Sequence, residues 1–213
     1  MAVVTAFVLA GCGGHELADY YPLVPGAQRY MKVYTRTIAG QDTNVTTEVR
    51  LVETVRGERD MPGLGKVWVV ETPGESAAAA GYAFFRKHED GIIQLVPQES
   101  TQPPVEILYV AMPLAKGLKW YDTRAQSEMM EVVDFDTVEV PAGRYPDCFE
   151  IQITGVKRKW TMHQWLAPDV GVVKWEQQAF WERKDGVTCE LLRRAELVAY
   201  KLPPKTGALP AGK

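Results

Sequence analysis

The stretch TEVRLVETV, residues 47–55, carries the pattern that decides the fold. Apolar residues alternate in it with charged and polar ones. An alternation with a period of two is typical of a β-strand that buries one face and exposes the other, as strands of antiparallel sheets do. The buried face is expected to carry Val49, Leu51 and Val55, and the solvated face Glu48, Arg50, Thr54 and Arg56.

Similar runs cover most of the chain and are separated by short turn motifs. These motifs are AGQD at 39–42, EDG at 89–91 and KDG at 184–186. Glycine supplies the positive φ that hairpin turns require. The alanine-rich segment 75–81 is shorter than the ~12 residues that an isolated helix needs, so we expect a loop there. The patterns therefore predict an all-β, antiparallel chain.

The chain also shows an internal repeat. The segments PLVPGAQRY at 22–30 and PLAKGLKWY at 113–121 share the frame Pro-Leu-x-x-Gly-x-x-x-Tyr, and the strand-like runs after each frame correspond in order. Two repeats, 20–112 and 113–201, are then expected to form one β domain. The predicted architecture is a strongly curved sheet, or an open or half barrel, of about ten strands in two similar meanders. Chance similarity among β-rich segments is the alternative.

Composition sets the class of the chain. Its 213 residues are 46% hydrophobic and 24% charged, as expected for a globular protein with a core of its own. The net charge is −3, and basic residues are interspersed with acidic ones, so no nucleic-acid partner is expected. Residues 202–213, LPPKTGALPAGK, have the Pro and Gly content of a disordered tail.

The amino-terminal segment has the properties of an export signal. Residues 2–10 are apolar and uncharged, and the run is shorter than the ~20 residues that span a bilayer. The sequence LAGC at 9–12 resembles the cleavage box of bacterial lipoproteins. This resemblance implies removal of residues 1–11 and attachment of lipid to Cys12, which leaves residues 12–19 as a lipidated tether.

Two features qualify this interpretation of the amino terminus. No Lys or Arg precedes the apolar run, so the true translation start is open, and a buried first strand with an incidental cysteine is the alternative. Gly13 stands where an Asp favours retention at the inner membrane in Gram-negative lipoproteins. The resemblance therefore implies an anchor in the outer membrane, with the domain in the periplasm.

Three further segments resemble a known group of proteins. They are YYPLVPGAQRYMKV at 20–33, VEVPAGRYPDCFEI at 138–151 and WLAPDVGVVKWE at 165–176. They are similar to the YYPLxPGxxW, VPAGxF and YAPGVGxVK signatures of an uncharacterised group of bacterial envelope proteins that includes many predicted lipoproteins. The chain departs from these signatures at Arg29 and Asp169. The resemblance implies a sheet similar to the half-barrels of lipoprotein carriers, and no particular activity.

The cysteines that remain after Cys12 allow two interpretations. An oxidising compartment would favour a disulfide between Cys148 and Cys189. The strand alternation places Cys148 with polar neighbours and Cys189 with apolar ones, which favours opposite faces of the sheet. Both alternatives stay open at the level of sequence.

Five of the six tryptophans lie after residue 119, in the second repeat. Large indole rings with one polar N–H are suited to lining an apolar groove, and a tryptophan-rich core is the alternative. The candidate groove residues are Trp120, Trp165, Trp175, Phe180 and Trp181.

Signals of catalysis are sparse. The chain has no Gly-x-Ser-x-Gly elbow, no metal-ligand spacing of Cys or His, and no glycine-rich phosphate loop. We therefore predict no catalytic residues, no cofactor and no metal site. An enzyme, of the hydrolase type, would need the fold to bring His163 together with Asp134 and Asp136.

The sequence thus predicts a non-enzymatic protein of the bacterial envelope, attached to the membrane through lipid on Cys12. Its curved sheet is expected to bind an apolar or amphipathic ligand, such as a lipid, or an envelope protein partner. The second hypothesis is a structural or assembly component of the outer membrane with a filled core.

Overall fold

The computed structural model describes residues 19–72, 81–98, 102–122, 128–155 and 159–203. The predicted signal peptide, lipidated Cys12 and most of the tether lie outside the described residues, as does most of the predicted tail. No helix among the described residues has the length and apolar character needed to cross a membrane.

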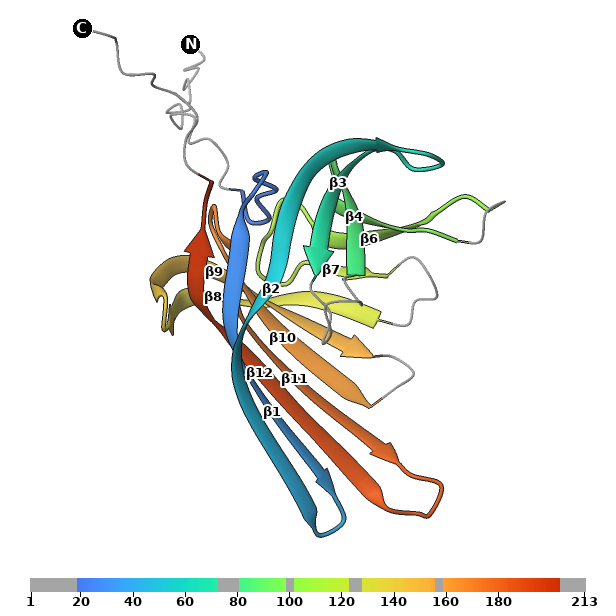
Figure 1. Cartoon of the computed structure of the whole chain (residues 1–213), viewed down its shortest axis with the longest axis vertical. Coiled ribbons are helices and arrows are strands. Elements are labelled where there is room, and N and C mark those ends of the chain that lie inside the picture. Colours follow the sequence, from blue (N-terminus) through green and yellow to red (C-terminus); the bar gives the residue numbers. More distant parts are fainter. Residues whose placement is uncertain (1–18, 73–80, 99–101, 123–127, 156–158, 204–213) are drawn as a thin grey trace, which may run out of the picture.

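The described chain folds as β-strands that pair antiparallel throughout (Figure 1). The fold-class prediction is confirmed: the protein is all-β and strongly curved, with twelve described strands where about ten were expected. The strands are β1 (Gln28–Ala39), β2 (Asp42–Met61), β3 (Gly65–Thr72), β4 (Gly81–His88), β5 (Gly91–Val96), β6 (Val105–Ala111), β7 (Lys119–Tyr121), β8 (Glu128–Val140), β9 (Gly143–Gly155), β10 (Trp160–Ala167), β11 (Gly171–Glu182) and β12 (Thr188–Lys201).

All twelve strands belong to one sheet. Its order is β6-β5-β4-β3-β2-β1-β12-β11-β10-β9-β8-β7, so two consecutive six-stranded meanders join where β1 pairs with β12. The sheet curls until its edge strands β6 and β7 approach each other, which leaves a barrel with one unsealed seam. The indole N–H of Trp120 on β7 donates across the seam to the carbonyl of Leu108 on β6, at 3.1 Å.

Strand β2 contains the stretch 47–55 and shows where simple alternation fails. A β-bulge at Val52 places one extra residue opposite β1, so the residues on either side do not keep a common face. Val55 is buried, as expected, but Val49 is 62% exposed and Thr54 is buried. The expectation that Val49 and Val55 share a buried face was therefore wrong.

Residues of both meanders fill the barrel interior. Tyr21, Val55 and Phe85 from the first half pack with Ile151 and Leu166 from the second in one buried cluster. Each large apolar side chain that leaves water contributes roughly 1.5–3 kcal/mol. The core therefore helps to hold the two meanders together, because among the described strands they pair with each other only through β1 and β12.

The hairpins β1–β2 and β11–β12 extend beyond the rest of the sheet (Figure 1). In β2, residues 42–49 are all exposed, so this part of the sheet has solvent on its surfaces. The paired ends Gln28 and Lys201 lie at the opposite end of these strands, where the described chain begins and finishes.

Candidate functional site

A cavity of about 650 Å³ opens where the described chain begins, and we call it the end pocket. Its walls come from the entering segment, the β4–β5 hairpin, the connection from β6 to β7, and strand β9. The lining residues are Asp19, Tyr20, Lys87, His88, Glu89, Gly91, Ile92, Met112, Pro113, Leu114 and Phe149. Both meanders therefore contribute to the pocket.

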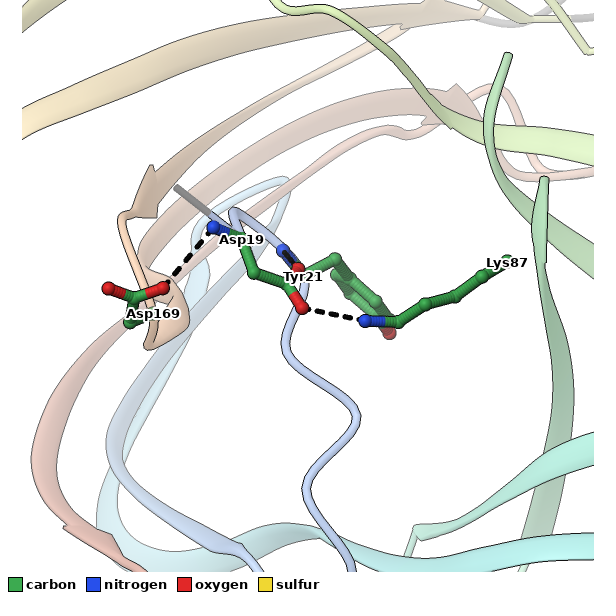
Figure 2. Close-up of polar contacts among 4 residues, drawn as sticks. All are labelled: Asp19, Tyr21, Lys87 and Asp169. Carbon is green, nitrogen blue, oxygen red and sulfur yellow. Dashed lines mark hydrogen bonds and ion pairs between the residues drawn. The ribbon is translucent and has the colours of Figure 1, made fainter. Parts of the chain in front are cut away.

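Asp19 fastens the entering segment to both halves of the protein (Figure 2). Its backbone N–H donates to Oδ1 of Asp169 at 3.2 Å, and the Asp169 N–H donates to the Asp19 carbonyl at 2.8 Å. Its carboxylate pairs with Nζ of Lys87 at 2.6 Å and accepts the backbone N–H of Tyr21 at 3.0 Å. One aspartate thus links strand β4 of the first meander to the β10–β11 turn of the second at the rim of the end pocket.

The end pocket combines an apolar floor with a polar rim. Ile92 is buried, and the rings of Tyr20 and Phe149 pack edge to face with centroids 5.0 Å apart. Lys87 and His88 are exposed on the rim. This arrangement fits a ligand that has an apolar body and a polar end.

His88, Glu89 and Asp90 form the β4–β5 turn beside the end pocket. Their donor atoms lie within 4.8 Å of one another, which is close enough to hold a metal ion. All three are exposed, and Nδ1 of His88 already pairs with Asp90 at 3.3 Å. An exposed turn of this kind is common in proteins that bind no metal, so it assigns no metal site.

A second cavity, of about 240 Å³, lies inside the barrel beside the seam between β6 and β7. Its polar lining includes Gln94, Asp122, Glu128 and Gln164. Partial burial raises the pKa of Glu128, and the nearby Asp122 carboxylate adds to the rise. We call this space the seam cavity.

Arg29 is a buried cation in the barrel interior, only 4% exposed. It forms an ion pair with Glu53 and donates through Nε to the carbonyl of Val170 at 2.9 Å. Burial lowers its pKa, and the neighbouring phenol of Tyr21 opposes that shift. Gly171 leaves room for the guanidinium, because a Cβ there would lie 2.7 Å from Nη2. Arg29 therefore ties the first meander to the β10–β11 turn of the second.

Two tyrosines, the buried Tyr21 and the partly buried Tyr109, accompany Arg29. Burial raises the pKa of Tyr21 well above its ordinary value and also raises that of Tyr109. Their rings pack edge to face, with centroids 5.4 Å apart. Both hydroxyls therefore stay protonated at neutral pH and serve the core as hydrogen-bonding groups.

The five candidate groove aromatics do not gather in one place. Trp120 is buried in the core at the seam, whereas Phe180 and Trp181 are exposed near the tip of the β11–β12 hairpin. Trp165 lies opposite Glu150 and Trp175 opposite Gln164, so the alternation along β10 places these two rings on different faces of the sheet. None of the five lines the end pocket or the seam cavity.

The rings of Trp165 and Trp175 each pack against a basic side chain of the sheet. Lys174 Nζ lies 4.4 Å from the ring centroid of Trp165, and the Arg193 guanidinium lies 5.5 Å from that of Trp175. Cation–π contacts of this kind contribute about 0.5–1 kcal/mol at exposed sites. Trp175 and Trp181 share a face because no bulge separates them on β11.

The three residues of the enzyme alternative lie on two strands that β9 separates, Asp134 and Asp136 on β8 and His163 on β10, and His163 and Asp134 have different partners. Nδ1 of His163 is 2.6 Å from Oε1 of Glu150. Asp134 lies opposite Glu150 in the β8–β9 register but accepts from Nζ of Lys116 at 2.8 Å, and this contact lowers the pKa of Asp134. Neither cavity described above includes them. The structure therefore forms no joint acid–base site from these residues.

Cys148 and Cys189 are both buried and free in the structure. Cys148 lies opposite Asp136 on β8, whereas Cys189 lies between Ala39 and Trp181 in the sheet. Burial raises the pKa of the Cys148 thiol to about 11. The disulfide that the sequence left open is therefore not formed here, and Cys148 is a poor nucleophile at neutral pH.

Sequence reasoning missed the end pocket, although a signal for it was available. Pro113 and Leu114 begin the second repeat frame, and Tyr20 stands just before the first. The two frames indicate an internal repeat, and residues at or just before their starts meet at the pocket. These residues become neighbours because the sheet curls until its edge strands β6 and β7, which the 112–118 connection joins, approach each other.

Comparisons with known proteins give one distant likeness. No family model matches the chain, and no curated protein matches it. The chain is similar to a crystal structure from Bacteroides fragilis NCTC 9343 that is described as an exported protein with a YmcC-like fold. The two share 18% sequence identity and a TM-score of 0.44, over 86% of this chain and 99% of that one.

Proposed function

We propose that this protein is a non-enzymatic, lipid-anchored protein of the bacterial envelope that binds an apolar or amphipathic ligand in its end pocket. The observation that carries the proposal is the end pocket itself. Its volume of about 650 Å³ lies within the range of roughly 300–1,000 Å³ that is typical of small-molecule sites. Its floor is apolar and its rim is charged.

The lipid anchor explains why such a pocket would lie at this end of the molecule. Cys12 precedes Asp19 by seven positions, and Asp19 lines the pocket. Seven extended residues span at most ~25 Å. Lipid on Cys12 would therefore hold the pocket near the bilayer surface, where amphipathic molecules are concentrated.

The anchor is tested by the mass of the protein extracted from membranes of its bacterial source. We expect a chain that begins at Cys12 and carries acyl groups on that residue. A Cys12→Ser variant should lose the modification and leave the membrane fraction. Recovery of the unmodified thiol from the cytosol would contradict the anchor and the envelope location together.

Ligand binding is tested with cis-parinaric acid, a fluorescent fatty acid, on the chain from Gly13 onward. We expect saturable binding that the Leu114→Glu variant weakens at least about tenfold, or ~1.4 kcal/mol. The reason is that a carboxylate on the apolar wall would be desolvated by the bound ligand. Leu202→Glu is the matched control, because Leu202 is exposed and lies outside the pocket.

Apart from the seam cavity, side chains fill the barrel interior, and this favours a second candidate function. The buried cluster of both meanders and the Arg29 ion pair occupy the space that a lipid carrier with an internal cavity would keep open. A structural or assembly component of the outer membrane needs only the outer surfaces of such a barrel. Failure of the fatty acid to bind, or equal binding by the Leu114→Glu variant, would favour this candidate.

A further inference from the structure

The outer edge of β2 is unpaired along its projecting part. β1 covers one side of β2 from Asp42 to Thr54, but β3 pairs with the other side only from Thr54 onward. No described strand pairs with that outer edge between Asp42 and Glu53. Backbone N–H and C=O groups along such an edge form a template for another strand.

This edge lacks most of the features that protect sheet edges from pairing. Residues 42–53 contain no Pro and no Lys, and they are rich in Thr and Val, which favour strands. Val45 is 51% exposed and Val49 is 62% exposed on the same face. The bulge at Val52 ends the regular segment on the barrel side.

We propose that the edge binds a second copy of this chain, by antiparallel pairing of β2 with the partner's β2 about Thr47. The free edge runs from residue 42 to residue 53, so its midpoint falls beside Thr47. Pairing centred there uses almost the whole edge. Pairing centred at Val49 would set residue 44 against the partner's Thr54, whose edge β3 already occupies.

The side chains are complementary in this register. Val45 lies opposite the partner's Val49, and two-fold symmetry gives this apolar contact twice. On the other face, Arg50 lies opposite the partner's Asn44, and Glu48 lies opposite the partner's Thr46. No like charges lie directly opposite each other, and Arg50 and Glu48 each face a side chain that can form a hydrogen bond with them.

The register makes a specific prediction for crosslinking in the full-length protein in membranes. Residues directly opposite in a sheet have Cα atoms about 4.5–5.5 Å apart, within the range that a disulfide requires. A Thr47→Cys variant should therefore form a disulfide-linked dimer under mild oxidation. Thr43→Cys is the matched control and should stay monomeric, because the register keeps it far from the partner's residue 43.

Further variants test the register itself. Val45→Cys and Val49→Cys should each remain uncrosslinked when expressed alone but should crosslink to each other when co-expressed. In the Thr47→Cys background, Asn44→Lys should reduce the crosslinked fraction about tenfold, because the introduced ammonium group would face the partner's Arg50. Adding Arg50→Glu should restore the fraction.

The outcomes separate self-pairing from other partners. A monomeric Thr47→Cys variant, or equal crosslinking at position 43, would overturn the proposal. Crosslinking of Thr47→Cys to a different protein would assign the edge to that protein and overturn the dimer. None of these outcomes depends on a ligand in the end pocket, so the two proposals fail independently.

Discussion

At the scale of single residues, Arg29 shows how one polar group organises an apolar barrel. In the sequence, Arg29 stands out only because the similar envelope proteins have tryptophan at this position. Its role follows from three partners far apart in the chain: Glu53, the carbonyl of Val170 and the ring of Tyr200. The pair with Glu53 joins the neighbouring strands β1 and β2, whereas the contacts with Val170 and Tyr200 form only when the two meanders come together, so no local pattern reveals them.

Removing the Arg29 guanidinium should strongly destabilise the fold. Arg29→Leu leaves Glu53 and the Val170 carbonyl without their donor, and the loss of one member of a buried pair typically costs 3–5 kcal/mol. Urea unfolding should show that the free energy of unfolding of Arg29→Leu is lower by about 3 kcal/mol. Arg56→Leu is the matched control on β2, because its ion pair with Glu71 is half exposed and should contribute no more than about 1 kcal/mol. If the two variants lose the same free energy of unfolding, the buried Arg29–Glu53 pair stabilises the fold no more than the half-exposed pair does.

At the scale of elements, the period-two pattern predicted the strands well and their pairing less well. Hydrophobic alternation and glycine turns identify strands because both are local. The bulge at Val52 depends on the partner strand β1, so the exposure of Val49 could not be foreseen from the stretch that contains it. The aromatic groove was predicted from ring content alone, and the faces of Trp165 and Trp175 were decided by pairing.

The entering segment, residues 19–27, is an element whose anchoring can be tested. Asp19→Ala removes the pair with Lys87 and the acceptor of the Tyr21 N–H. A hydrogen bond to a charged group contributes about 1.5–3 kcal/mol, so the Tyr21 amide should exchange hydrogen at least about tenfold faster.

The control for this measurement is Asp185→Ala. Asp185 likewise accepts a backbone N–H two residues later, from Val187 at 3.3 Å, but lies in the turn after β11. The Asp185→Ala variant should leave the rate of hydrogen exchange at the Tyr21 amide unchanged. An unchanged rate in the Asp19→Ala protein would mean that packing alone holds the segment.

At the scale of the whole molecule, the two meanders form a barrel whose two ends carry different features. One end gathers the entering segment, the β4–β5 turn and the start of the second repeat into the end pocket. The other end carries the projecting hairpins and the free edge of β2. The curved all-β architecture was accessible from sequence, whereas the pocket arises from long-range closure that no single segment encodes.

The pairing of β1 with β12 also determines when the protein can fold. The central ladder of the sheet joins Gln28 to Lys201, so β1 lacks one of its two partner strands until β12 has been synthesised. Until then, the first meander has one side of β1 open, and contacts of such long sequence separation form slowly. A chain that crosses a membrane in an extended state could thus form this ladder only after β12 has crossed.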